Sequence, residues 1–371
     1  MKNRTHHVSR SVVFVACLAA ITAGWAAWQQ SQSAATQSVS KEFAQLVGRF
    51  SEAGGWFDTD NLISNEKSYL HVVPQLEHAG VSGGVYIGVG PDQNFSYIAR
   101  IRPEVAFIVD IRRDNLLLHL MFKALFAISR NRMEYLAHLT GTRAPEDIEG
   151  WSDASINGIV AYLDRQTETG EIGVSRRLQE AVRAFGVPVS DEEMQTIHRF
   201  HAEFMNRRLS LRFHSQGRLP RSYYPTYREL LLETDREGRQ LSYLASEADY
   251  QFLRSLQARG GVIPVVGDLG GTHALSAIGK WMKERNQHLA AFYVSNVEDY
   301  LFRSQDFAQY MDNLNTLPHS ERSVVIRSIF GRFGLRDSAP GYYSTSTVQN
   351  VREMLSNYSA GKYRTYTELV R

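Results

Sequence analysis

The chain has 371 residues, of which 43% are hydrophobic and 22% charged, with 27 Gly and 10 Pro. This composition is typical of a globular protein and excludes collagen-like, low-complexity and fully disordered chains. Lys and Arg number 41 against 39 Asp and Glu. Because residues 1–40 hold three of those bases and no acid, the remainder is close to neutral, so we expect no nucleic-acid partner. The single cysteine, Cys17, excludes intrachain disulfides and cysteine-based zinc sites.

Residues 1–40 have the composition of an export signal or a membrane anchor followed by a linker. A basic start precedes a largely apolar stretch from Val12 to Trp28, and a polar tract rich in Gln, Ser and Thr follows. The apolar stretch is long for a signal peptide and short for a membrane span, which needs about 20 residues. Cleavage after Ala35 and an uncleaved anchor both stay open. In either case the basic start predicts export of the body, to the periplasm or tethered to a bacterial inner membrane.

Residues 41–129 are predicted to hold N-terminal helices and the first half of a sheet. A helical pattern covers Lys41 to Phe57. Two apolar runs, Val85 to Ile87 and Val105 to Ile111, are typical of strands buried on both faces. Each is followed by a helical pattern, first Asn94 to Arg102 and then Asn115 to Ser129, the second with Asp114 or Asn115 placed to cap it.

Residues 130–250 differ in character, and we expect them to form a helical insertion. Charged amphipathic patterns dominate, such as Ser175–Phe185 and Asp191–Arg208, and the second begins with a capping box of Ser190 and Glu193. The stretch from Leu211 to Thr226 is rich in Arg, Tyr and Pro and is predicted to be a loop.

In residues 251–371 the alternation of helix and strand resumes. Apolar strands are predicted at Val262 to Val266 and Leu289 to Ser295, and helices at Ser246 to Arg259, Thr272 to Asn286 and Val348 to Tyr358, while Ser323 to Phe330 suits either a strand or a helix. The alternation predicts an α/β fold with a doubly wound, mostly parallel, Rossmann-like sheet, interrupted by the helical insertion.

Three predicted strand ends carry residues suited to a ligand crevice, because open parallel sheets bind ligands outside the carboxyl ends of their strands. Gly88 and Gly90 follow the first strand and allow a tight turn. Asp110 ends the second strand, 20 residues beyond Gly90, at the spacing of an acid that binds ribose hydroxyls. Asp268 follows the third. The alternative is that these are ordinary strand-to-helix turns, with Gly for geometry and Asp as a cap.

The run Val85–Asp92 resembles the first motif of class I S-adenosylmethionine-dependent methyltransferases. Within this resemblance, Asp110 corresponds to the ribose acid and Asp268-Leu269 to the adenine-side acid and its neighbour. The run Tyr293–Leu301 is similar to the Asn-Val-x-x-Tyr segment of chemotaxis-receptor-type methyltransferases. The body also resembles a bacterial family without an assigned function.

The resemblance implies a Rossmann-like fold of methyltransferase type, with S-adenosylmethionine or a related nucleoside as the small-molecule ligand. The residues implied to bind it are Gly88, Gly90, Asp92, Asn94, Asp110, Asp268, Leu269, Ser295 and Asn296. Methyl transfer from a sulfonium mainly needs alignment of donor and acceptor, so no metal is expected. Further candidates near the crevice are Glu66, Tyr69 and Glu298.

Two positions depart from the family motif. Tyr86 stands where an acid usually precedes the first glycine, and Asp92 stands at the usual position of the third glycine. Together with the export signal, these departures favour an alternative function: a non-catalytic binding module, membrane-tethered or periplasmic, with a degenerate cofactor site. A literal Gly-x-Ser-x-Gly match at Gly80–Gly84 lacks the preceding strand of a nucleophile elbow, which disfavours a hydrolase.

Overall fold

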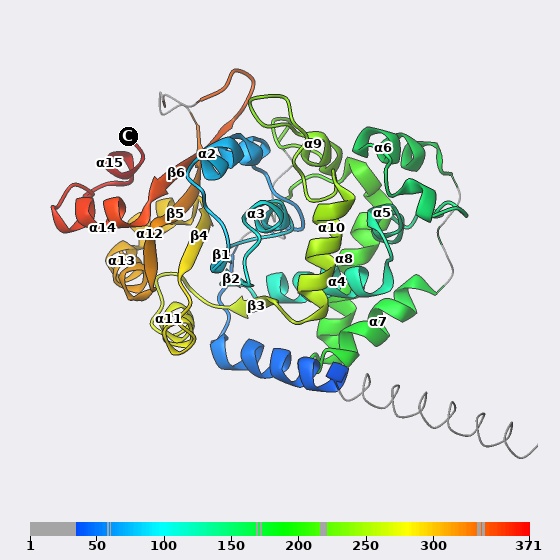
Figure 1. The fold of residues 1–371 in the computed structure, drawn as a ribbon, viewed down its shortest axis with the longest axis horizontal. Coiled ribbons are helices and arrows are strands. Elements are labelled where there is room, and N and C mark those ends of the chain that lie inside the picture. The colour runs from blue at the N-terminus through cyan, green and yellow to red at the C-terminus, as the bar shows by residue number, and fades with distance from the viewer. Residues whose placement is uncertain are drawn as a thin grey trace, which may run out of the picture.

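A six-stranded sheet flanked by helices organises the computed structural model (Figure 1). The structure describes residues 35–57, 59, 61–167, 170, 173–215, 221–331, 335 and 338–371. In the sheet the strands lie in the order β3-β2-β1-β4-β5-β6. Their bounds are β1 (Val85–Gly88), β2 (Val105–Asp110), β3 (Val262–Val266), β4 (Leu289–Ser295), β5 (His319–Phe330) and β6 (Ser344–Asn350). These strands confirm the predicted α/β class and the mostly parallel sheet.

The centre of the sheet is β1, which pairs in parallel with β2 on one side and with β4 on the other. β3 continues beyond β2 and β5 beyond β4, both in parallel, and only β6 runs antiparallel to its neighbour. The order of the strands therefore reverses between β1 and β4. Nearly every side chain of β1 to β4 is buried, because helices cover the sheet, and this explains their continuous apolar sequences.

The last strand, β6, had no signal in the sequence. Its residues are mostly polar, and its buried serines bond to other hydroxyl groups rather than to apolar side chains: Ser344 Oγ and Ser346 Oγ lie 3.0 and 3.1 Å from Ser68 Oγ. The apolar pattern that marks the other strands is therefore missing. The following helix begins at Val351 rather than at Val348 as predicted.

The N-terminal helix covers residues 35–50 and ends earlier than the predicted Phe57. From there the chain runs along the end of the sheet, where Glu52 N donates to Val266 O at 2.9 Å and Gly55 N to Ile111 O at 2.8 Å. The predicted side-chain cap of the helix after β2 is also wrong, since that helix begins at Arg113 and its N-cap, Arg112, makes no side-chain cap bond.

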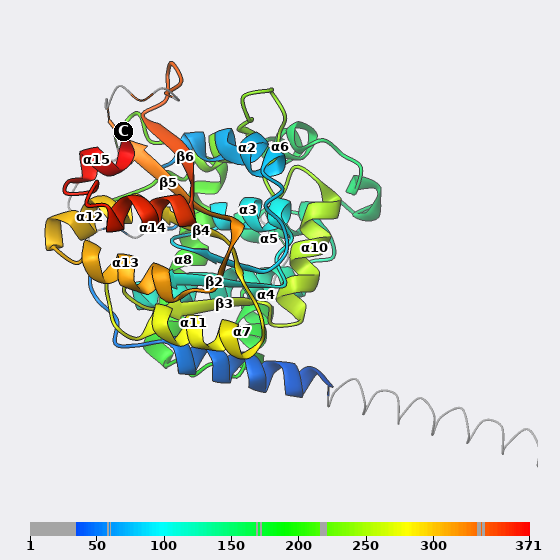
Figure 2. The same cartoon turned by 60° about the vertical axis from the view of Figure 1, so that its left-hand side comes forward.

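The remaining helices before and after the insertion flank the sheet (Figure 2). They are η1 (Lys67–Val72), α2 (Val73–His78), α3 (Gln93–Ile101), α4 (Arg113–Ile128), α10 (Glu247–Ala258), α11 (Ala274–Glu284), α12 (Val297–Ser304), α13 (Phe307–Thr316), α14 (Val351–Ser359) and α15 (Tyr366–Val370). None of the helices in the described ranges is both long and apolar enough to cross a membrane. The stretch Val12–Trp28 lies outside the described residues.

Between α4 and α10 the chain forms a block of helices, on the right in Figure 1. They are α5 (Arg132–Thr140), η2 (Glu149–Trp151), α6 (Ile156–Arg165), α7 (Val174–Ala184), α8 (Asp191–Arg207), η3 (Arg208–Ser210) and α9 (Tyr227–Leu232). α7 and α8 pack on α4, and the buried side chains of the block belong to the same hydrophobic core as the sheet. The predicted capping box of Ser190 and Glu193 is present at the start of α8.

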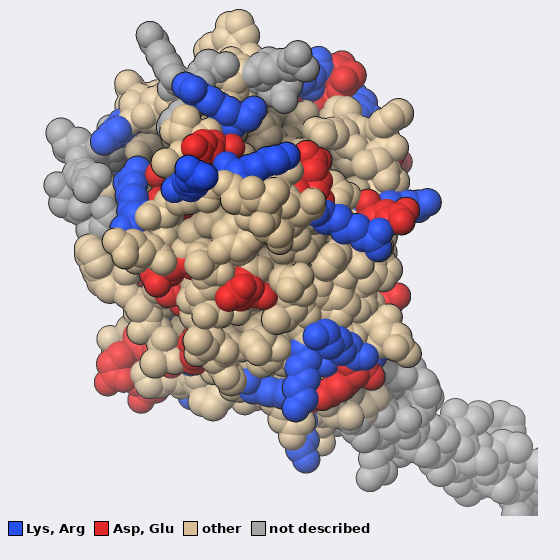
Figure 3. Space-filling view, turned by 90° about the vertical axis from the view of Figure 1, so that its left-hand side faces the viewer, with Lys and Arg blue, Asp and Glu red and all other residues tan. Residues whose placement is uncertain are grey.

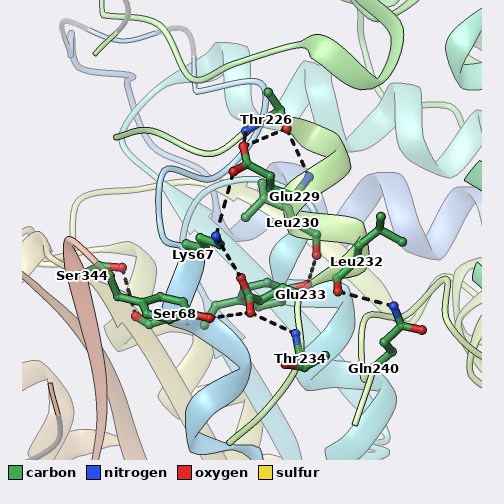
Figure 4. Close-up of polar contacts among 12 residues, drawn as sticks. Lys67, Ser68, Thr226, Glu229, Leu230, Leu232, Glu233, Thr234, Gln240 and Ser344 are labelled. Atoms are coloured by element: carbon green, nitrogen blue, oxygen red, sulfur yellow. Dashed lines mark hydrogen bonds and ion pairs between the residues drawn. The ribbon is translucent and has the colours of Figure 1, made fainter. Parts of the chain in front are cut away.

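The end of this block is tied to the sheet through η1 (Figure 4). Lys67 Nζ lies 3.9 Å from a carboxylate oxygen of Glu229 and 4.0 Å from one of Glu233, which lie on and just after α9. Tyr69 Oη donates to Leu230 O at 2.9 Å. Ser68, which lies between Lys67 and Tyr69 in the sequence, bonds to Ser344 of β6. Through these three residues, η1 connects the insertion to the edge strand β6.

Candidate functional site

A cavity of about 570 Å³ opens at the carboxyl ends of β1 to β4. It lies where the strand order reverses, which is the usual ligand position in sheets of this kind. Six of the nine residues predicted to bind a cofactor line it: Gly90, Asp110, Asp268, Leu269, Ser295 and Asn296. Gly90 has φ +79°, a conformation that favours glycine, so its place in the tight turn after β1 has a physical reason.

The other three predicted residues, Gly88, Asp92 and Asn94, do not line the cavity. Asn94 is fully buried, and its Nδ2 donates to the carbonyl of Val89 at 2.8 Å and to that of Pro91 at 2.7 Å. A Cβ atom at Gly88 would lie 1.9 Å from Asn94 Oδ1. Gly88 and Asn94 therefore shape the turn from inside and have no exposed atom for a ligand.

Asp92 instead fixes the helical block to the turn. Its Oδ2 accepts hydrogen bonds from Tyr227 Oη at 2.9 Å and from Tyr243 Oη at 3.1 Å. Burial raises the pKa of Asp92 to about 6, against the opposite effect of the two hydroxyl groups. The carboxyl group at the third-glycine position of the motif thus serves packing.

Asp110, the predicted ribose acid, lines the cavity but is held by Arg112. Oδ1 accepts from the backbone N and from Nε of Arg112, each at 3.0 Å, and Oδ2 accepts from Nη2 at 2.8 Å. Arg112 also donates to Thr59 O at 3.0 Å and is only 7% exposed. A carboxylate has about four acceptor positions, so one remains for a ligand hydroxyl.

Asp268, the predicted adenine-side acid, folds back onto its own turn. Its Oδ1 accepts from Gly270 N at 2.9 Å, while its backbone N donates to Glu52 Oε1 at 2.9 Å. Within the described part of the chain, its Oδ2 makes no hydrogen bond. This oxygen is therefore a free acceptor on a residue that lines the cavity.

Glu66 contributes to the cavity wall a buried carboxyl group that is bonded to hydroxyl groups. It precedes η1, is 1% exposed, and accepts hydrogen bonds from the hydroxyls of Tyr293, Ser295 and Ser328. Burial raises the pKa of Glu66, although the three hydroxyl groups act in the opposite direction. Ser295 has φ +52°, a strained conformation for a side chain other than glycine, and this directs its hydroxyl at Glu66.

Amide and aromatic side chains complete the wall. Gln93 Nε2 donates to Tyr293 Oη at 3.0 Å, and Gln93 Oε1 is buried and makes no hydrogen bond to any described residue. The rings of Phe57 and Tyr300 meet edge to face, with centroids 5.1 Å apart. Such rings offer apolar surface to a flat ligand.

The charged groups around the cavity are mainly acidic. Among the described residues, four carboxyl groups line it: Glu66, Asp110, Asp268 and Asp306. Two guanidinium groups also line it, those of Arg112 and Arg303. Each guanidinium already has a partner, since Arg112 binds Asp110 and Arg303 binds Asp299. A neutral or cationic ligand fits this charge better than an anion. On the molecular face shown in Figure 3, basic and acidic side chains are interspersed above and below a central zone in which a few acidic side chains lie among uncharged ones.

Comparison with protein-family models gives one match, over residues 61–370, to a family described as a domain of unknown function (DUF7790). The chain belongs to this family. No curated protein matches it. The matched range contains the six strands of the DUF7790 domain and most of the cavity lining, whereas Phe57 lies just before it. Among the described residues, no group of three or more His, Cys, Asp and Glu side chains is arranged to hold a metal.

Sequence reasoning did not find several of the residues that define this cavity. Glu66 was a candidate without a motif, Tyr300 was noted only as the last position of the Asn-Val-x-x-Tyr segment, and Gln93, Arg112 and Phe57 were not singled out. The pairing of Asp110 with Arg112 has a weak signal, an Asp-x-Arg spacing at a strand end. The Phe57–Tyr300 and Glu66–Ser295 contacts join positions more than 200 residues apart, so no local pattern marks them.

Proposed function

We propose that this chain is a methyltransferase-like protein with a Rossmann-like fold, and that it binds S-adenosylmethionine or a related nucleoside at the carboxyl ends of β1 to β4. One observation carries the proposal: Gly90, Asp110 and Asp268, from three different strand ends, line a single cavity at the reversal of strand order. The physical principle that open α/β sheets bind ligands at this point supports the assignment.

The proposed ligand position follows from the free acceptors and the charge. The Oδ2 atom of Asp268 accepts from the exocyclic amine of the base, and the remaining acceptor position of Asp110 accepts from a ribose hydroxyl. A Cβ atom placed on Gly90 would lie no closer than 3.5 Å to any neighbouring atom, which leaves room for the ligand beside the turn. The excess of carboxyl groups suits a sulfonium cation.

We propose that Glu66 acts as the general base for the molecule that accepts the methyl group. An acceptor that attacks through N–H or O–H loses a proton when it takes the methyl group. A carboxyl group whose pKa is raised by burial, and which lines the same cavity, is suited to receive that proton. The acceptor molecule itself is not assigned.

Isothermal titration calorimetry on the full chain tests the binding step, with S-adenosylmethionine and S-adenosylhomocysteine as titrants. We expect both to bind, and Asp268→Asn to weaken binding at least tenfold, about 1.4 kcal/mol. Asparagine retains the Oδ1 acceptor for Gly270 but replaces the free Oδ2 by a donor. Asp312→Asn, on the exposed face of α13, is the matched control and should bind like the wild type. Absence of heat with both compounds would refute the proposal.

A second candidate function rests on the Asp110–Arg112 ion pair and on Tyr86. Arg112 occupies three of the acceptor positions of Asp110, and Tyr86, at the usual acid position, donates to Asn94 Oδ1 at 2.8 Å instead of facing the cavity. Both favour a non-catalytic binding module, membrane-tethered or periplasmic. A reporter enzyme fused after residue 371 separates the two functions. Periplasmic reporter activity favours the module, because the methyl donor is cytosolic, whereas cytoplasmic activity favours the enzyme.

A further inference from the structure

A second cavity, of about 390 Å³, lies between the N-terminal helix of residues 35–50, α4 and α10. It shares no lining residue with the cavity at the strand ends. Its volume falls within the range of small-molecule sites, about 300–1,000 Å³. The residues that decide its chemistry are Phe43, Lys123, Phe126, Phe185, Arg254 and Gln257.

Lys123 places a positive charge inside this cavity. It lies in α4, is 6% exposed, and donates to Gln257 O, while its Nζ lies 4.4 Å from the ring centre of Phe43 and 5.1 Å from that of Phe185. An ammonium group has three donors, and burying it without a counter-charge is costly. None of the described residues that line the cavity is acidic. Burial lowers the pKa of Lys123 to about 7.

Gln257 supplies the second polar group. It is 2% exposed, and neither Nε2 nor Oε1 of its side-chain amide makes a hydrogen bond to any residue that the structure describes. Arg254 Nε is likewise buried without a hydrogen bond. Buried amide groups in proteins are nearly always bonded, so an unsatisfied amide near an ammonium group that has no counter-charge in the cavity lining indicates a place for a polar ligand atom.

We propose that this cavity binds a small carboxylic acid that carries an apolar chain. The carboxylate lies between Lys123 Nζ and the amide of Gln257, and the chain packs on the rings of Phe43, Phe126 and Phe185. The ammonium group and the amide Nε2 can each donate to one oxygen of a carboxylate. The aromatic walls favour an apolar chain over a fully hydrated anion.

Calorimetry with octanoate on the full chain tests the site, with octanol and octylammonium as probes of equal chain length. Octanoate is expected to bind, octanol at least tenfold more weakly, and octylammonium not at all. Failure of octanoate to bind, or tighter binding of octylammonium, overturns the proposal. Because no nucleoside is present, these outcomes are independent of the function proposed for the strand-end cavity.

Variants locate the binding. Lys123→Met should weaken octanoate binding at least tenfold and bring it to the level of octanol, since methionine fills the same space among the rings without the charge. Lys280→Met, at an exposed position of α11, is the matched control and should bind like the wild type. Gln257→Met is a second test of the proposed carboxylate position and should also weaken octanoate binding. Wild-type affinity in a folded Lys123→Met protein would contradict the assignment.

Discussion

The cavity wall around Glu66 and the helical contact around Asp92 each bury a carboxyl group beneath hydroxyl groups, yet they have different roles. Glu66 accepts from Tyr293, Ser295 and Ser328 and lines the strand-end cavity. Asp92 accepts from two tyrosines and does not line that cavity. Burial raises the pKa of both groups. A raised pKa alone therefore does not distinguish the two groups, whereas contact with the cavity does.

A third buried carboxyl group, Glu298, extends the comparison because its partner is charged. Arg327 Nε donates to Glu298 at 2.6 Å, and both side chains are almost fully buried. Glu298 follows the Asn-Val pair that resembled a methyltransferase motif, but it does not line the cavity. Its place in the fold is to pair α12 with β5.

The largest effect is expected from breaking that ion pair. Arg327→Met leaves Glu298 buried without its counter-charge and should lower the free energy of unfolding by about 3–5 kcal/mol. Urea unfolding followed by circular dichroism measures it. Arg303→Met is the control, since Arg303 binds Asp299 at an exposed position and should change stability by less than about 1 kcal/mol. Equal effects of the two substitutions would mean that burial does not distinguish these pairs.

The next effect is a pH dependence at Asp92. The folded-state pKa of about 6 lies above the unfolded value of 3.8, so the protonated carboxyl stabilises the fold. This contribution is complete below pH 4 and is lost as the pH rises through 6; the loss is about 3 kcal/mol. Asp92→Asn should remove it. The difference in unfolding free energy between wild type and Asp92→Asn must then change across this range; a difference independent of pH would contradict the assignment.

Glu66 should respond to a ligand in a way that Asp92 does not. A sulfonium bound in the cavity lowers the pKa of Glu66, so binding of S-adenosylmethionine should release protons. Calorimetry in two buffers of different ionisation enthalpy counts them. Neutral S-adenosylhomocysteine should release fewer, and Glu66→Gln should abolish the difference between the two ligands, whereas Asp92→Asn should leave it unchanged. An unchanged proton count in Glu66→Gln would remove Glu66 from the site.

The smallest effects concern single hydroxyl groups. Tyr227→Phe removes one donor from Asp92, and Ser328→Ala removes one from Glu66, and each should lower stability by about 1 kcal/mol. Tyr227→Phe should also raise the pKa of Asp92 further, because the lost bond stabilised the ionised form. That shift appears in the pH profile of unfolding. No shift would mean that Tyr243 alone sets the environment of Asp92.

The sequence predicted those parts of the fold whose side chains repeat a local pattern. β3 and β4 were located to the residue, because helices cover both strands and leave continuous apolar runs. β6 was not predicted because its buried residues Ser344 and Ser346 are polar. Both form hydrogen bonds with Ser68 Oγ instead of apolar contacts, so the strand has no apolar pattern. Of the predicted site, Gly90, Asp110 and Asp268 do meet, since strand ends of a parallel sheet share one edge. Asp92 and Asn94 do not, because the turn after β1 directs them into the interior.

A crystal structure of the full chain grown with saturating S-adenosylhomocysteine tests the central claim most directly. We predict the ligand between Gly90, Asp110 and Asp268, with the base at Asp268 Oδ2 and the ribose at Asp110. A ligand bound elsewhere, or a strand-end cavity left without ligand under those conditions, would contradict the account.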